Sequence, residues 1–166
     1  MNKRIRQYVG LITAIVFYYL FHEGAHFLYA LITGSFTKIN FLGFGIQIGI
    51  NDEMMSDTQL GIFCILGSLT TLVLGYLLVV SARNITKSSS KVFIACAYYV
   101  TIAMLLIDPL YLSILCGFFG GGDMNGISLL LPEMVARISY GVILLFNAFL
   151  FWNLVLPKYT KAFHNL

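Results

Sequence analysis

Apolar residues dominate four long stretches of the chain, at residues 8–32, 60–82, 92–117 and 138–156. A helix that crosses the hydrocarbon core of a bilayer needs about 17–25 apolar residues, and the four stretches have about this length. Because a helix satisfies its own backbone hydrogen bonds, as hydrocarbon requires, the pattern predicts four transmembrane helices. The expected fold is an all-α membrane protein in which residues 1–166 form a single membrane-embedded domain.

A shorter alternation follows the first apolar stretch. Ile46, Ile48 and Ile50 alternate with a polar residue and a glycine, which is the period of a β-strand. Glycines just before them permit a tight reversal, so we expect a short membrane-associated β-hairpin within residues 36–50. Its open edge would hold an extended peptide by backbone hydrogen bonds. An ordinary interfacial loop is the alternative.

Composition and charge agree with a membrane protein. The chain is 59% hydrophobic and only 10% charged, whereas soluble domains carry about 25% charged residues. Eight of the ten basic residues lie before the first stretch, between the second and third, or after the fourth. The positive-inside rule then predicts a multi-pass protein of the cell membrane with both termini in the cytoplasm. This asymmetry accounts for the net charge of +3, so no nucleic-acid partner is expected.

Three ionisable residues interrupt the first apolar stretch: His22, Glu23 and His26. Such groups are costly inside a membrane span and usually mark a functional site. Histidines at positions i and i+4 lie on one face of a helix, so both imidazoles can bind one metal ion. The adjacent glutamate can then reach a water bound to that ion. The spacing predicts a zinc (Zn²⁺) site inside the membrane.

A catalytic zinc has three protein ligands and one open position. The only other histidine, His164, follows the last apolar stretch, so the third ligand is expected to be a carboxylate. Asp108 lies at a similar depth in a straight helix. Asp123 follows three glycines that can turn its carboxylate back toward the histidines. Asp123 is the preferred ligand and Asp108 the alternative.

The order of these features resembles the site-2 protease family of intramembrane zinc metalloproteases. The resemblance implies that His22 and His26 bind the metal and that Glu23 is the catalytic general base. Residues 66–71 look like the family's Ala-Gly-Pro-x-x-Asn motif, which implies substrate-binding roles for Gly67 and Thr71. Thr71 stands where asparagine is usual. Residues 122–126 are similar to the family's Leu-Asp-Gly motif only in the aspartate and its glycine neighbours.

The family resemblance implies hydrolysis of a peptide bond in or near a transmembrane segment of a membrane protein substrate, within the lipid bilayer. One alternative is a non-catalytic zinc-binding membrane protein, either an inactive homologue or a transporter. Another is an intramembrane aspartyl protease that uses Asp108 and Asp123, because residues 120–123 fit a Gly-x-Gly-Asp pattern. That alternative leaves the two histidines and Glu23 without a task. The sequence does not indicate an oligomeric state.

Overall fold

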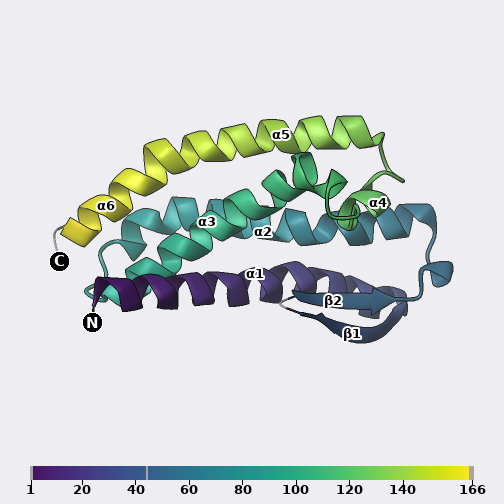
Figure 1. Ribbon diagram of the computed structural model, residues 1–166, viewed down its shortest axis with the longest axis horizontal. Helices are drawn as coiled ribbons and strands as arrows, with labels where there is room; N and C mark the ends of the chain where they lie inside the picture. Colours follow the sequence, from purple (N-terminus) through teal and green to yellow (C-terminus); the bar gives the residue numbers. More distant parts are fainter. Residues whose placement is uncertain (1, 44, 165–166) are drawn as a thin grey trace.

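The computed structural model describes residues 2–43 and 45–164, and most of them are helical. The elements in chain order are α1 (Lys3–Thr33), β1 (Phe36–Leu42), β2 (Gly45–Ile50), η1 (Asp52–Met54), α2 (Asp57–Ile85), α3 (Lys91–Ser113), η2 (Leu115–Gly117), α4 (Asp123–Ile127), α5 (Glu133–Leu150), η3 (Phe151–Val155) and α6 (Leu156–His164). The long helices run along the longest axis of the molecule (Figure 1). Both ends of the chain lie at one end of this bundle, and the hairpin and α4 lie toward the other.

Four helices are long and apolar enough to cross a membrane: α1, α2, α3 and the continuous helix from Glu133 to His164. The prediction of four such helices is therefore confirmed. Three of these helices extend past the predicted stretches. Their outer turns are polar, so a prediction from apolar residues alone does not include these turns. The third helix is shorter than predicted and ends at Ser113 rather than at residue 117.

The predicted hairpin is also present. Strands β1 and β2 pair antiparallel, with Ile39 opposite Ile48 and Phe36 opposite Ile50. The hairpin begins where Gly34 ends α1 in a left-handed conformation (φ 70°), and the N–H of Gly34 donates to carbonyls in the last turn of the helix. This turn folds the hairpin back along α1 (Figure 1).

Pro109 interrupts the hydrogen bonding of α3. It has no N–H to donate to the carbonyl of Leu105, four residues earlier. Asn147 of α5 replaces the missing donor, because its Nδ2 lies 2.7 Å from that carbonyl oxygen. The Oδ1 atom of Asn147 accepts a hydrogen bond of 2.8 Å from Tyr76 of α2. One fully buried amide therefore links α2, α3 and α5.

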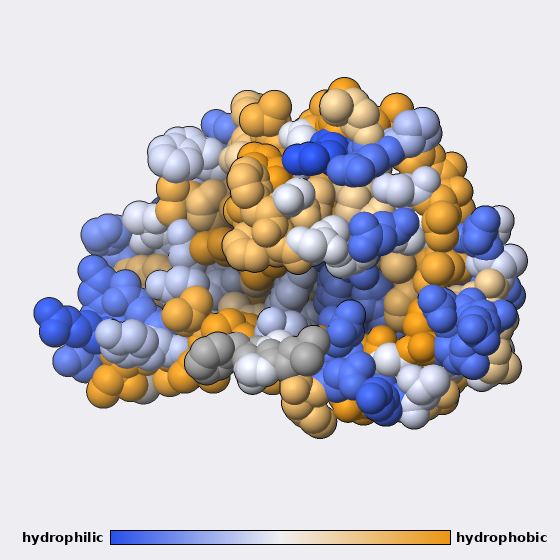
Figure 2. All heavy atoms as spheres, turned by 45° about the vertical axis from the view of Figure 1, so that its right-hand side comes forward, coloured by the Kyte–Doolittle hydropathy of each residue, from blue (hydrophilic) through white to orange (hydrophobic). Residues whose placement is uncertain are grey.

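Large apolar side chains remain exposed on the long helices, including Leu20, Val80 and Leu145. Apolar side chains (orange) cover much of the face in Figure 2, and hydrophilic ones (blue) lie at its left and right margins and in a band near its centre. Soluble monomers rarely expose so much apolar surface. The exposed apolar side chains on the long helices are what a bilayer would cover.

We expect Asn147→Leu to destabilise the bundle by about 1–2 kcal/mol, because the Leu105 carbonyl and the Tyr76 hydroxyl both lose their partner. Thermal unfolding of the purified protein in detergent measures the effect. Asn153→Leu is the matched control, since the Asn153 amide is exposed and bonds only within its own helix. Equal losses in the two variants would contradict a special role for Asn147.

Candidate metal centre

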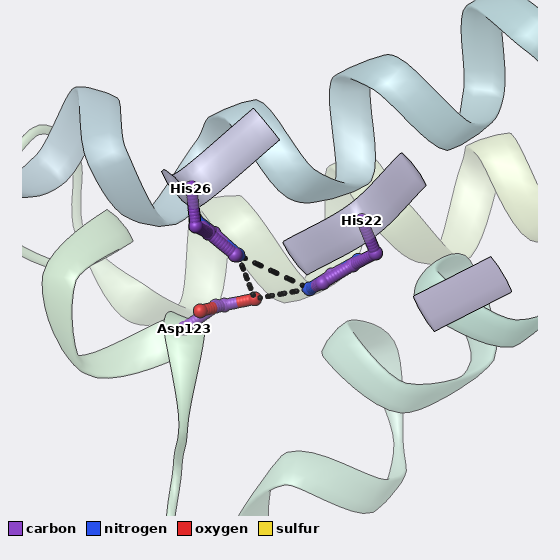
Figure 3. Close-up of side chains that lie close together, drawn as sticks. All are labelled: His22, His26 and Asp123. Carbon is purple, nitrogen blue, oxygen red and sulfur yellow. Dashed lines mark hydrogen bonds and ion pairs between the residues drawn. The ribbon is translucent and has the colours of Figure 1, made fainter. Parts of the chain in front are cut away.

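The structure brings His22 and His26 of α1 together with Asp123 of α4. The two Nε2 atoms lie 3.2 Å apart. Oδ2 of Asp123 lies 3.1 Å from Nε2 of His22 and 3.6 Å from Nε2 of His26. Figure 3 shows the two rings and the carboxylate pointing toward one another. Among the described residues, these three form the group that could hold a metal ion.

The spacing of the three atoms suits a metal ion with short bonds. Ligand atoms held at about 2.0–2.1 Å around a tetrahedral zinc are separated by about 3.3–3.4 Å. The observed separations of 3.1, 3.2 and 3.6 Å bracket that value. Burial alone would raise the pKa of Asp123, but the hydrogen bonds and charges of His22 and His26 hold it well below its usual range.

The second nitrogen of each imidazole also has a partner. Nδ1 of His26 lies 2.8 Å from the backbone carbonyl oxygen of Phe63 on α2. Nδ1 of His22 lies 3.2 Å from Oδ1 of Asp108 on α3. A carbonyl oxygen only accepts, so Nδ1 of His26 carries the proton and its Nε2 has a free lone pair. Partners of this kind fix the orientation of metal-binding histidines.

Asp108 and Asp123 thus occupy different sides of His22. Asp108 is almost completely buried and faces Nδ1, whereas Asp123 faces Nε2. The structure brings the preferred candidate, Asp123, to the two histidines and gives Asp108 a supporting position. The imidazole lies between the two carboxylates, which is not the arrangement of an aspartyl dyad sharing one proton.

Two hydroxyl groups hold Asp108 in place. Tyr18 donates to Oδ1 of Asp108 at 2.5 Å, and Thr71 donates to Oδ2. Thr71 is completely buried, so its hydroxyl is occupied within the protein. Its substrate-binding role stays a prediction. Sequence reasoning did not identify Tyr18 or the Phe63 carbonyl as parts of the site, although a tyrosine one helical turn before His22 was a usable signal.

Gly67 of α2 packs directly against the two imidazoles. A Cβ atom at this position would lie 2.6 Å from Nε2 of His26 and 2.7 Å from Nε2 of His22. Real Cβ atoms do not approach other atoms so closely. The missing side chain lets α2 approach α1 and leaves room at the two Nε2 atoms. A direct role of Gly67 in substrate binding stays a prediction.

The glycines before Asp123 make the turn that returns its carboxylate to the histidines. Gly120, Gly121 and Gly122 all have positive φ angles, of 86°, 83° and 47°. L-residues with side chains rarely adopt such angles. The turn places Asp123 at the first position of α4, a short helix that packs on α2. The expected return of this segment toward the histidines is confirmed.

Glu23 lies at the edge of a cavity of about 240 Å³ whose walls include Asp123, His26 and strand β2. Its Oε2 atom accepts a hydrogen bond of 3.1 Å from the backbone N–H of Ile48. Backbone groups in an antiparallel pair alternate between the partner strand and the outer edge. The N–H of Ile48 therefore belongs to the outer edge of β2, which faces Glu23 and the cavity.

We expect Gly67→Ala to weaken zinc binding by about tenfold or more, because overpacking by one methyl group at this contact costs about 1–3 kcal/mol. Competition with a chelator of known affinity measures the change in the purified protein. Gly24→Ala is the matched control: it lies on α1 between the two histidines, and an added Cβ there meets nothing within 4 Å. Equal zinc affinities for the two variants would exclude steric control by Gly67.

The two acids should respond differently to replacement. If the group holds zinc, we expect Asp123→Ala to lose stoichiometric zinc, because a candidate ligand is removed, and Asp108→Ala to bind zinc about 10–100-fold more weakly. Asp108→Asn should fall between the wild type and Asp108→Ala, since its amide oxygen still accepts from Nδ1 of His22. Elemental analysis after dialysis, followed by chelator titration, distinguishes the variants. Loss of zinc from Asp108→Ala with retention by Asp123→Ala would reverse the two roles.

Comparisons with known proteins identify no relative. No model of a known protein family matches the chain, and no curated protein or solved structure matches it. The function of the chain therefore has to be argued from the chemistry of its own residues.

Proposed function

We propose that the chain is an intramembrane zinc metalloprotease of the site-2 protease type. The observation that supports this most is the convergence at ligand spacing of Asp123 with His22 and His26, which belong to a helix long and apolar enough to cross a membrane. Two imidazoles and one carboxylate leave one position open on a tetrahedral ion, which is the arrangement of catalytic zinc. The substrate would be a membrane protein whose peptide bond lies in or near a transmembrane segment.

The residues of this centre have separate tasks in the proposed reaction. His22, His26 and Asp123 would hold the ion, and Asp108 would orient His22. The bound ion would supply Lewis acidity toward a water molecule and toward the carbonyl of the peptide bond. Glu23 would accept a proton from the water and deliver it to the departing amine nitrogen as the C–N bond breaks and a C–O bond forms. The proton released by the water is thus consumed by the product.

The outer edge of β2 is the proposed substrate-binding surface. If an extended peptide adds to this edge, one of its carbonyl oxygens would accept a hydrogen bond from the N–H of Ile48. That N–H now donates to Glu23, so the incoming strand would release the carboxylate for proton transfer. A helical substrate segment hides its carbonyls and would have to unwind before it pairs with β2.

The arrangement of the chain ends supports a proposal for the membrane placement. The two chain termini and the connection between α2 and α3 lie at one end of the bundle (Figure 1), and most basic residues belong to these segments. We therefore propose a multi-pass protein of the cell membrane with both termini in the cytoplasm. His22 lies 19 residues after the start of α1, about 28 Å along the helix. The metal centre thus lies toward the other side of the membrane.

We expect Glu23→Gln to keep zinc but to lose peptide hydrolysis by about 10²–10⁴-fold, because the amide cannot accept the proton. The protein is reconstituted in liposomes with a pool of single-span membrane peptides, and mass spectrometry detects the new termini. Glu53→Gln, on the exposed helix η1, is the matched control and should cleave like the wild type.

Two outcomes would contradict this assignment. Cleavage that survives in Glu23→Gln would exclude Glu23 as the general base. Stoichiometric zinc without cleavage of any peptide in the pool would favour a non-catalytic zinc-binding membrane protein.

A further inference from the structure

A second cavity has a volume of about 470 Å³. The helix ends that line it lie at the end of the bundle away from the hairpin (Figure 1). It is bounded by the start of α1, the first half of α3 and the last turns of α6. Lys3 and Arg6 line it from α1, Tyr98 and Tyr99 from α3, and His164 from α6. The metal centre and its cavity share no residue with it.

In the described part of the chain, the walls of this cavity carry positive charge and no acidic side chain. Lys3 and Arg6 are three residues apart in α1 and so share one face of the helix. Among the described residues, neither forms an ion pair, and none of the lining residues is acidic. The guanidinium of Arg6 instead lies 5.2 Å from the ring centre of Phe163. This contact holds the cation at the cavity through the face of an aromatic ring.

The size and lining of the cavity favour a ligand larger than a simple ion. Its volume falls within the range of about 300–1,000 Å³ that is usual for small-molecule sites. Aromatic side chains supply much of the wall beside the two cations. Tyr159, also in the lining, is fully buried, and its hydroxyl has no hydrogen-bond partner in the described part of the chain. Such a mixed wall suits a ligand with an anionic group and an apolar or polyol part.

The position of the cavity indicates where such a ligand comes from. Helices α1 and α3 are each long and apolar enough to cross a membrane, and both begin at this end of the bundle. Their first turns therefore lie at the level of the lipid headgroups. Basic pockets between membrane helices on the cytoplasmic side bind anionic lipid headgroups. Tyrosines are also enriched at this level of a membrane.

We propose that this cavity binds the phosphate headgroup of an anionic membrane lipid. Lys3 and Arg6 contact the phosphate, and the tyrosines of α3 contact the glycerol part of the headgroup. The bound lipid links the first turn of α1 to α6. This site is independent of the metal centre and of peptide hydrolysis.

The test compares phosphatidylglycerol with phosphatidylcholine on the purified full-length protein. Native mass spectrometry of the protein in mixed micelles counts the retained lipid, and thermal unfolding measures its stabilising effect. The wild type should retain phosphatidylglycerol in preference and unfold at a higher temperature with it. Lys3→Gln/Arg6→Gln should lose the preference by about tenfold or more, since two cations near an anionic lipid are removed.

A matched control separates the cavity from general surface charge. Arg4→Gln/Lys87→Gln removes the same charge from exposed positions at the same end of the bundle, outside this cavity, and should keep the preference. Lys3→Arg/Arg6→Lys keeps the charge and should also keep the preference for phosphatidylglycerol. Equal losses in the two glutamine double variants would overturn the proposal, because binding would then depend on surface charge alone.

Inorganic phosphate is the last ligand to be compared in the unfolding experiment. If it raises the unfolding temperature in phosphatidylcholine as much as phosphatidylglycerol does, the ligand is a soluble phosphate and the lipid proposal is wrong. Zinc content is measured in every variant and should not change. A failure of lipid binding is therefore distinguishable from a failure of the metal centre.

Discussion

Polar groups buried among apolar helices must find their partners within the protein, and this constraint organises the whole molecule. The clearest case is His22, which lies between Asp108 on one side and Asp123 on the other. Three helices meet at this imidazole, because its partners come from α3 and α4. The second histidine is held by a backbone carbonyl of α2. The groups that make up the candidate metal centre therefore also fix how four helices pack.

Two local irregularities make this packing feasible. At Gly67 a side chain is absent, and α2 comes close enough to face both imidazoles. At Pro109 a backbone donor is absent, and a side-chain amide from α5 takes its place. Pro109 directly follows Asp108 in α3. The helix that supplies the buried acid is therefore also the helix that needs the hydrogen bond from Asn147 of α5. The same few residues thus serve both the packing of the helices and the candidate metal centre.

Sequence periodicity was sufficient for the features that depend on one element. The spacing of His22 and His26 placed both rings on one helix face, and the alternation around Ile48 predicted the strand. The choice between Asp108 and Asp123 needed the fold, because three positive φ angles at Gly120–Gly122 turn the chain back in a way that counting residues along a straight helix misses. The partner of the Thr71 hydroxyl likewise depends on how α2 is rotated against α3.

The end of the fourth helix is a second feature that the sequence pattern alone does not predict. Pro157 favours a break close to residue 156, where the apolar stretch ends, yet the chain continues helically to His164. A π-helical segment, Phe151–Val155, ends two residues before Pro157, and widened turns of this kind accommodate irregular hydrogen bonding within a helix. The helical continuation brings His164 to the cavity that Lys3 and Arg6 also line. Hydropathy alone could not predict this meeting of the two termini.

The length of α1 has a geometric consequence for the protein in a bilayer. Its 31 residues span about 46 Å at 1.5 Å per residue, whereas the hydrocarbon core measures about 30 Å. Membrane helices lean by about 20° on average, which shortens the projected length by only a few ångströms. A helix of this length is longer than the hydrocarbon core is thick, and its basic first turn, with Lys3, Arg4 and Arg6, is the part best suited to water and lipid headgroups.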